Sequence, residues 1–203
     1  MPTSVFFHCT FAAGYPGGGK VIALEPEPKN YALLSHTVKS YQEKKIIETL
    51  AVAVDSSDGN AKLFFNPLHP GDHKLGSEGL EVTTISIDTL LEKRNWPSVS
   101  LVKIDVQGAE MRVLAGARRT ISHLRPAFFV EMDESALAQF GTSTQEIFCF
   151  FHEFAYSAHS MQKNGISEPL AMLDIRHILE KRNYTDIVFC RFPVARATVQ
   201  RLI

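Results

Sequence analysis

Short apolar runs rich in β-branched residues alternate along this chain with amphipathic stretches of helical length. This alternation constrains the fold most, because parallel strands need a crossover between them, usually a helix. The sequence therefore predicts an α/β fold with a mostly parallel, doubly wound sheet. The predicted strands are 20–26, 48–54, 61–65, 81–87, 100–106, 126–132 and 185–192. The predicted helices are 31–41, 108–126, 143–159 and 174–183.

Length and composition indicate one globular domain over residues 1–203, with 45% hydrophobic and 21% charged residues. The formal net charge is -1, so the chain has no excess of basic residues that would favour binding to nucleic acid or an anionic membrane. No apolar run reaches transmembrane length. Cys9, Cys149 and Cys190 are odd in number and widely spaced, as expected for reduced thiols in a cytoplasmic protein.

The stretch "GYPGGGK" places Gly14, Gly19 and Lys20 in the frame of a phosphate-binding loop. That loop needs Ser or Thr after the lysine, a strand before it and a helix after it. Val21 follows here, and it begins a predicted strand. The glycines are therefore interpreted as a turn that leads into this strand.

Ligands of such sheets bind beyond the carboxyl ends of the strands, which directs attention to Glu25, Asp55, Asp105 and Glu131. Glu25 could accept hydrogen bonds from the two ribose hydroxyls of a cofactor, or it could be a surface acid or a helix N-cap. Asp105 could orient a substrate or cofactor, or act as a base. Lys103, inside the same apolar strand, is expected to pair with a neighbouring acid.

Other polar residues offer fewer interpretations. Asp72 and His73 stand side by side in "HPGDHKLG", where His73 could accept a proton or bind substrate, or the segment could be a polar turn. Glu110 opens a predicted helix and complements its dipole. His152 and His159 could share a helical face, but two imidazoles are too few for a metal site. No metal is predicted.

Several segments together resemble the FkbM family of S-adenosylmethionine-dependent methyltransferases. They are "GKVIALEPEPKNYALL", "LAVAVDSSDGNAKLFF", "GDHK", "VTTISIDTLL", "VKIDVQGAEMRVLAGA" and "RPAFFVEM". The resemblance is strongest over residues 17–134 and follows the family's order and spacing. It implies a Rossmann-like methyltransferase sheet and methyl transfer from S-adenosylmethionine, usually to an oxygen of a sugar or other small metabolite.

Carried over by position, the resemblance implies a role for each matching residue. It makes Asp105 or His73 the catalytic base, without choosing between them. The implied substrate-binding residues are Asp72, His73 and Glu110. The implied cofactor-binding residues are Glu25, Pro26, Asp55, Ser56 and Asp105.

Two departures from the family pattern are visible. Gln107 stands where the family more often has Glu, so a neutral amide replaces a carboxylate. The family also begins with a strand and a "D-x-G-A-N-x-G" turn, followed by a helix. Here "SVFFHCTFAAGYPGGG" matches only that helix and its following turn. The sequence therefore predicts that the first, central strand is missing and that strands 20–26 and 100–106 face a gap with unpaired backbone.

Two functions remain open from the sequence. One is an FkbM-type O-methyltransferase, read from a truncated chain. The other is a catalytically inactive domain that binds a metabolite or partner. An NAD-dependent oxidoreductase would need G-x-G-x-x-G about 20 residues before Glu25, and the chain has none there.

Overall fold

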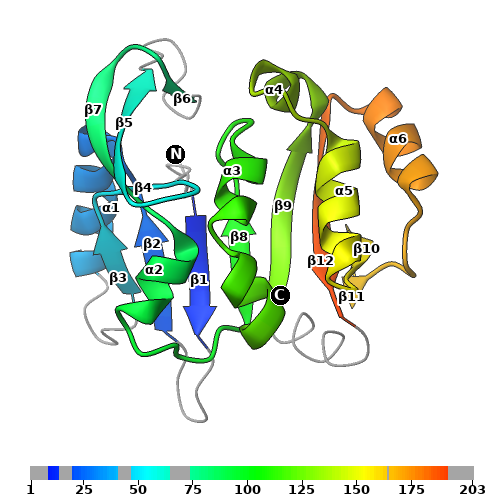
Figure 1. Cartoon of the computed structure of the whole chain (residues 1–203), viewed down its shortest axis with the longest axis horizontal. Helices are drawn as coiled ribbons and strands as arrows, with labels where there is room; N and C mark the ends of the chain where they lie inside the picture. The colour runs from blue at the N-terminus through cyan, green and yellow to red at the C-terminus, as the bar shows by residue number, and fades with distance from the viewer. Residues whose placement is uncertain (1–8, 14–19, 41–46, 65–73, 164, 192–203) are drawn as a thin grey trace.

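A computed structural model of the protein describes residues 9–13, 20–40, 47–64, 74–163 and 165–191. Its described part holds a large twisted sheet with helices packed against it and a smaller sheet above one end (Figure 1). The large sheet has eight strands. In order across it they are β11 (Gly165–Ile166), β10 (Ser157–Gln162), β12 (Tyr184–Cys190), β9 (Ala127–Asp133), β8 (Leu101–Ile104), β1 (Cys9–Ala13), β2 (Lys20–Leu24) and β3 (Ile47–Leu50).

This α/β arrangement confirms the predicted Rossmann-like architecture. Parallel pairing joins β2 to β3 and β8 to β9. The pairings also make β10 run in this common direction, whereas β1, β11 and β12 run in the opposite one. The strands of the smaller sheet, in order, are β4 (Ala53–Val54), β7 (Leu80–Ile85), β5 (Gly59–Phe64) and β6 (Lys74–Gly76).

The predicted gap between β2 and β8 is not present, because β1 fills it. Residues 9–13 were expected to belong to a helix and turn, and they form a strand instead. This strand pairs antiparallel with β2 on one side and with β8 on the other, so that Thr10 lies level with Ala23 and Lys103. The backbone groups of both central strands thereby gain partners, which a buried sheet requires. The family's first strand would run in the opposite direction.

The flanks of the glycine segment fit its interpretation as a turn. Ala13 and Lys20, on either side of residues 14–19, are paired with each other. They lie at the end of β2 that is distant from Glu25. The segment itself lies outside the described residues.

Helices pack along the sheet. The helices are α1 (Pro28–Ser40), α2 (Ile87–Glu92), α3 (Glu110–Ala115), the π-helical turn η1 (Thr120–Leu124), α4 (Glu134–Gln139), α5 (Thr144–Glu153) and α6 (Met172–Lys181). The predicted helix 108–126 is interrupted at Gly116, where an added Cβ would lie 2.5 Å from the Asp55 carbonyl oxygen. The predicted helix 143–159 ends early at Glu153. Ala155 then takes a left-handed conformation, and His159 lies in β10, away from His152 on the helix.

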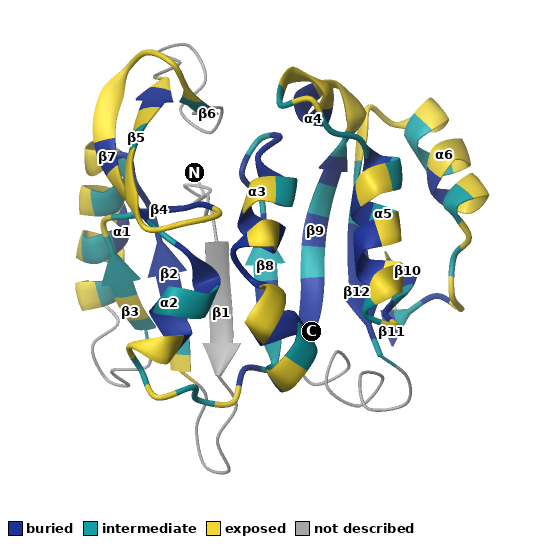
Figure 2. Ribbon diagram, viewed as in Figure 1, coloured by how far each residue is buried: buried dark blue, intermediate teal, exposed yellow. Residues whose placement is uncertain are grey.

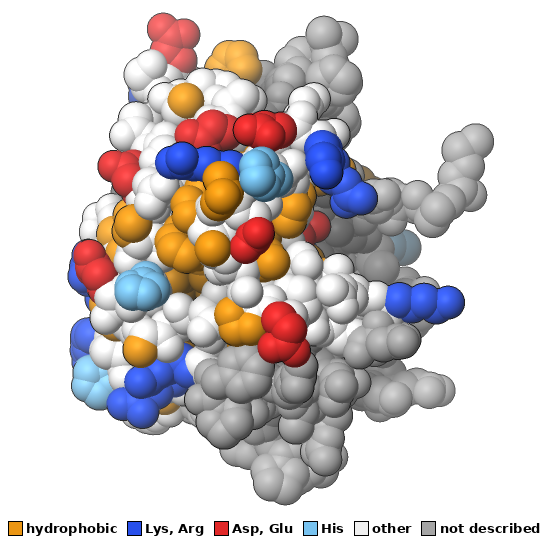
Figure 3. Space-filling model, turned by 90° about the vertical axis from the view of Figure 1, so that its right-hand side faces the viewer, with side chains coloured by type: hydrophobic (Ala, Val, Ile, Leu, Met, Phe, Trp, Pro, Cys, Tyr) orange, Lys and Arg blue, Asp and Glu red, His pale blue; other side chains and the backbone are white. Residues whose placement is uncertain are grey.

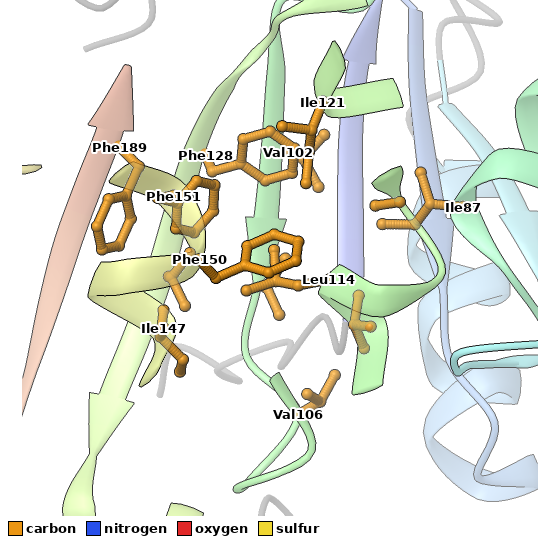
Figure 4. Close-up of a cluster of buried hydrophobic side chains, with 14 of the residues drawn as sticks. Ile87, Val102, Val106, Leu114, Ile121, Phe128, Ile147, Phe150, Phe151 and Phe189 are labelled. Atoms are coloured by element: carbon orange, nitrogen blue, oxygen red, sulfur yellow. The ribbon is translucent and has the colours of Figure 1, made fainter. Parts of the chain in front are cut away.

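The main core lies between the large sheet and the helices α2, α3 and α5. Aromatic rings dominate one side of it, where Phe151 stacks on Phe189 with ring centroids 4.1 Å apart and also contacts Phe128 (Figure 4). Figure 2 shows that β9 and β12 are mostly buried and that β8 is partly buried, whereas the outer faces of the helices are exposed. This burial fixes the positions of the strands whose ends carry polar residues.

The side of the molecule near α6 keeps some apolar surface. Leu173 of α6 and Tyr184 of β12 are 61% and 56% exposed. Figure 3 views this side and shows apolar side chains mixed with acidic, basic and histidine side chains. None of the helices in the described residues is both long and apolar enough to cross a membrane.

The position of β1 leads to a first prediction. Thr10→Pro is expected to lower the free energy of unfolding by roughly 3 kcal/mol, because proline removes a backbone donor from a strand paired on both sides. Urea denaturation followed by circular dichroism measures the change. Thr10→Ser keeps the backbone N–H and is the control. Equal stability of the proline variant and the control would contradict a paired β1.

Candidate active site

Polar residues gather at one edge of the large sheet, where β2, β3, β8 and β9 end. Leu24 and Ile104 both lie level with Cys9 of β1. Glu25 and Asp105 directly follow them, so their backbones are two strand spacings apart, about 10 Å. Ile104 also lies level with Val130 of β9, which brings Glu131 next to Asp105. This edge is where ligands of such sheets bind.

Glu25 is 1% exposed and holds the turn after β2. Its Oε1 accepts the backbone N–H of Glu27 at 2.8 Å, and its own N–H donates to the Leu50 carbonyl at 3.0 Å. The carboxylate of Glu27 in turn accepts the N–H of Asn30 in the first turn of α1. Glu27, not Glu25, therefore caps this helix. Pro26 between them is buried.

Asp55 follows β4 and is 5% exposed. Arg112 of α3 binds it with two nitrogens, with Nε 2.8 Å from Oδ1 and Nη2 on Oδ2. The N–H of Ser56 also donates to Oδ1, at 2.7 Å. Both oxygens of the Asp55 carboxylate are therefore used in hydrogen bonds, and those with Arg112 join the smaller sheet to α3. Ser56 itself is exposed, and its side chain is available to a ligand.

The loop from Asp105 to Glu110 has an unusual backbone conformation. Gln107 and Gly108 have positive φ angles of 54° and 104°. Glu110 is 2% exposed, and its Oε1 accepts the N–H groups of Val106 and Gly108 at 3.2 and 3.1 Å. Its other oxygen is buried and has no hydrogen-bond partner among the described residues. Glu110 thus stabilises the loop, and the substrate role implied for it stays a prediction.

Asp105 is the centre of a polar cluster. Lys103 Nζ lies 2.7 Å from Asp105 Oδ2, which confirms that this lysine pairs with a neighbouring acid. Gln107 Nε2 lies 3.2 Å from Asp105 Oδ1 and 3.3 Å from Glu131 Oε2. Asp186 of β12 lies directly across from Glu131. Three carboxyl groups therefore share this place with one lysine and one neutral amide.

This imbalance of charge changes the acidity of the cluster. Burial raises the pKa of Glu131 to about 8, and the negative charges of Asp105 and Asp186 and a hydrogen bond with Asp105 add to the effect. Burial also raises the pKa of Asp186, where the charges of Lys103 and Asp105 oppose each other. The pKa of Glu110 is raised by its burial as well. Glu131 therefore holds a proton at neutral pH.

The structure brings some predicted site residues together and not others. Asp105 and Glu25 lie at the same edge, whereas Asp72 and His73 lie outside the described residues. No role was predicted for Asp186 or Arg112. The single signal for Asp186 was its charge inside an apolar strand. In the part of the chain that the structure describes, no three His, Cys, Asp or Glu residues are arranged to hold a metal ion.

The loop depends on Gly108, which leads to a second prediction. A Cβ at this glycine would lie 2.3 Å from the Ala136 carbonyl oxygen, and its φ is 104°. Gly108→Ala is expected to cost about 3 kcal/mol or more of unfolding free energy. Gly141→Ala is the matched control, because Gly141 also has positive φ but nothing within 4 Å of an added Cβ. It should cost about 1 kcal/mol. Similar losses in both variants, measured by thermal and urea unfolding, would contradict this packing.

The raised pKa of Glu131 leads to a third prediction. Between its ordinary value of 4.5 and about 8, the folded state keeps a proton on Glu131 that the unfolded state has lost. Stability should therefore fall as the pH rises through this window and level off above it. Glu131→Gln removes this contribution, so the variant should not lose stability in this way. The urea midpoint of the variant should therefore rise relative to that of the wild type from about pH 5 to about pH 8. A difference that does not change with pH would contradict the raised pKa of Glu131.

The chain resembles known methyltransferases in sequence. The profile of the FkbM methyltransferase domain matches residues 3–158, most of the chain. The hexuronic acid methyltransferase AglP of Haloferax volcanii is 35% identical over 98 residues, which cover 47% of this chain and 40% of that protein. A crystal structure of methyltransferase FkbM from Methylobacillus flagellatus KT aligns with a TM-score of 0.49 at 15% identity, covering 84% of this chain and 36% of that one.

In both comparisons the match spans less than half the length of the other protein. The domain profile, by contrast, extends through both central strands and the whole of the polar edge from Glu25 to Glu131. The chain therefore belongs to the FkbM methyltransferase domain family.

Proposed function

We propose that this protein transfers a methyl group from S-adenosylmethionine to an oxygen of a sugar or another small metabolite. The observation that carries the proposal is the placement of Glu25 and Asp105 at one sheet edge, level with each other and about 10 Å apart across β1. Family membership supplies the type of reaction. The name of the Haloferax relative, a hexuronic acid methyltransferase, supports a sugar acid or related sugar as the acceptor.

The residues present suit an adenosyl cofactor in part. Glu25 has two carboxylate oxygens, of which Oε1 accepts the Glu27 amide, and a carboxylate is the group that matches the two hydroxyls of a vicinal diol. Because Glu25 is 1% exposed, cofactor binding must first uncover it. Ser56 and the backbone after β4 would lie beside the adenine, since the Asp55 carboxylate is occupied by Arg112. When bound, the cofactor supplies an electrophilic methyl group.

The protein's own residues then have two tasks in an in-line methyl transfer. They must hold the acceptor oxygen in line with the methyl group, and they must remove the proton of an acceptor hydroxyl. Asp105 is suited to orient the acceptor, because Lys103 and Gln107 hold its carboxylate in place. His73 stays a candidate base from the sequence.

A binding module without catalysis is the second candidate. The observation in its favour is that β1 runs antiparallel to β2 and β8, whereas the family's first strand would run parallel to them and end in the glycine-rich turn. Such a module would bind its ligand at the same edge and release no methylated product. Turnover of S-adenosylmethionine separates the two functions.

Calorimetric titration with S-adenosylhomocysteine tests the cofactor site. We expect wild-type affinity on the order of micromolar, and a loss of roughly tenfold to a hundredfold in Glu25→Ala, because hydrogen bonds to a charged group are lost. Glu25→Gln can still accept the Glu27 amide, so it should fold normally while one ribose acceptor becomes a donor.

Glu153→Gln, at an exposed position of α5, is the neutral control and should bind as the wild type does. A folded wild-type protein that does not bind S-adenosylhomocysteine would contradict the proposed function.

A further inference from the structure

We propose that Glu131, paired with Asp105, is the catalytic base that takes the proton from the acceptor hydroxyl. The inference rests on the proposed methyl transfer and assigns one of its steps. It differs from the sequence interpretation, in which Asp105 or His73 could act as base and Glu131 had no role.

Gln107 fixes the two carboxyl groups side by side. Its amide nitrogen lies 3.2 Å from an oxygen of Asp105 and 3.3 Å from an oxygen of Glu131. An amide has two N–H donors, so one nitrogen can serve both acceptors at once. Gln107 lies in the loop after β8, and its side chain reaches both Asp105 at the end of β8 and Glu131 on β9. A glutamate at this position would add a fourth carboxyl group to the cluster instead.

The neighbouring charges favour different protonation states for Asp105 and Glu131. Lys103 binds Asp105 at 2.7 Å and compensates its negative charge. Glu131 faces Asp105 directly after β8, Asp186 on β12 and Glu110 on α3, and each of these acids disfavours its ionisation. Two carboxyl groups this close share a proton instead of both ionising, and the proton resides on the member without the cation. Here that member is Glu131.

Other acids in the cluster are less suited to the role. Glu110 is 2% exposed and its Oε1 is bound to two backbone amides of the loop. The charge of Asp105 is compensated by Lys103, which weakens it as a base. Glu131 is half-buried, so it is open to an acceptor and to solvent. Its pKa of about 8 is close to the working pH, which is the favourable range for a general base.

The step balances without another reactant besides S-adenosylmethionine. The acceptor O–H bond breaks and its proton passes to ionised Glu131. The acceptor oxygen forms a bond to the methyl carbon, while the sulfur keeps the electron pair of the broken carbon–sulfur bond and becomes neutral. Glu131 then returns its proton to solvent. No leaving group needs a proton, so Glu131 serves as base and not as acid.

The charge of the cluster also bears on the acceptor. A carboxylate acceptor would meet the negative charges of Asp105 and Asp186, whereas a hydroxyl would find a hydrogen-bond acceptor. We therefore expect transfer to a hydroxyl of a sugar, including a sugar acid, and an ether product. A methyl ester would overturn the proposal, because a carboxylate acceptor has no proton for Glu131 to remove.

The test has a readout that is independent of turnover. In infrared difference spectra at neutral pH, the wild type should show a protonated carboxyl band that disappears as the pH rises through about 8. The band should be missing from Glu131→Gln and present in the exposed-site control Glu153→Gln. A wild-type spectrum without a band that depends on Glu131 would overturn the proposal, even if S-adenosylhomocysteine binds.

Methyl transfer from S-adenosylmethionine to glucuronic acid supplies the second readout. Wild-type kcat/KM should rise with pH and level off above about 8. In Glu131→Gln it should fall by about a hundredfold to ten-thousandfold and lose the rise with pH, with unchanged affinity for S-adenosylhomocysteine. Gln107→Glu should move the midpoint of the rise to higher pH. Turnover and pH dependence of the wild-type kind in Glu131→Gln would overturn the role.

The two proposals fail in different ways. If the folded wild type does not bind S-adenosylhomocysteine, the proposed function is wrong, and so is the role of Glu131. Intact binding without turnover of glucuronic acid would count against the acceptor class, and the infrared band then decides whether Glu131 holds the proton.

Discussion

The pairing of β1 on both sides is the interaction on which the rest of the structure depends. β2 and β8 are buried central strands, and each needs a neighbour for its backbone groups. β1 pairs with both strands at once, and it sets Leu24 level with Ile104. This register places Glu25 and Asp105 at the same height on the same edge. A strand of either direction can satisfy the backbone, which explains how an antiparallel strand can stand in the position of a parallel one.

The chemistry of the edge depends next on the loop that follows β8. The left-handed conformation of Gly108 and the contact of Glu110 with the loop amides fix the direction of Gln107. Gln107 can then bind Asp105 and Glu131 together. Because the residue that departs from the family pattern is a neutral amide, the cluster keeps three carboxyl groups, and one lysine and one shared proton offset two of their three negative charges. The side chain at position 107 of the loop thereby influences the protonation of Glu131 on β9.

Much of this could be predicted from the sequence. The apolar runs identified β2, β8, β9 and β12, and the acids at the ends of β2 and β8 were expected at the ligand-binding edge. Ser143 caps α5 at the start of the predicted helix 143–159, where its hydroxyl accepts the Glu146 N–H. The wrong predictions concern residues 9–13, the helix 108–126, which is interrupted at Gly116, and the end of α5. Strand formation depends on neighbours supplied by distant segments, and the helix ends at a left-handed Ala155 that its sequence does not demand.

The sequence by itself determined most of the alternation of strands and helices and the presence of an acid where β2 and β8 end, because hydrophobic period and strand length are local properties. Only the tertiary structure decided which acids meet. Asp105, Glu131 and Asp186 come from three strands far apart in the chain, and their contact depends on the register of β8 with β9 and of β9 with β12. A slip of one residue would turn Glu131 to the other face of the sheet, so its proton exists only in the folded protein.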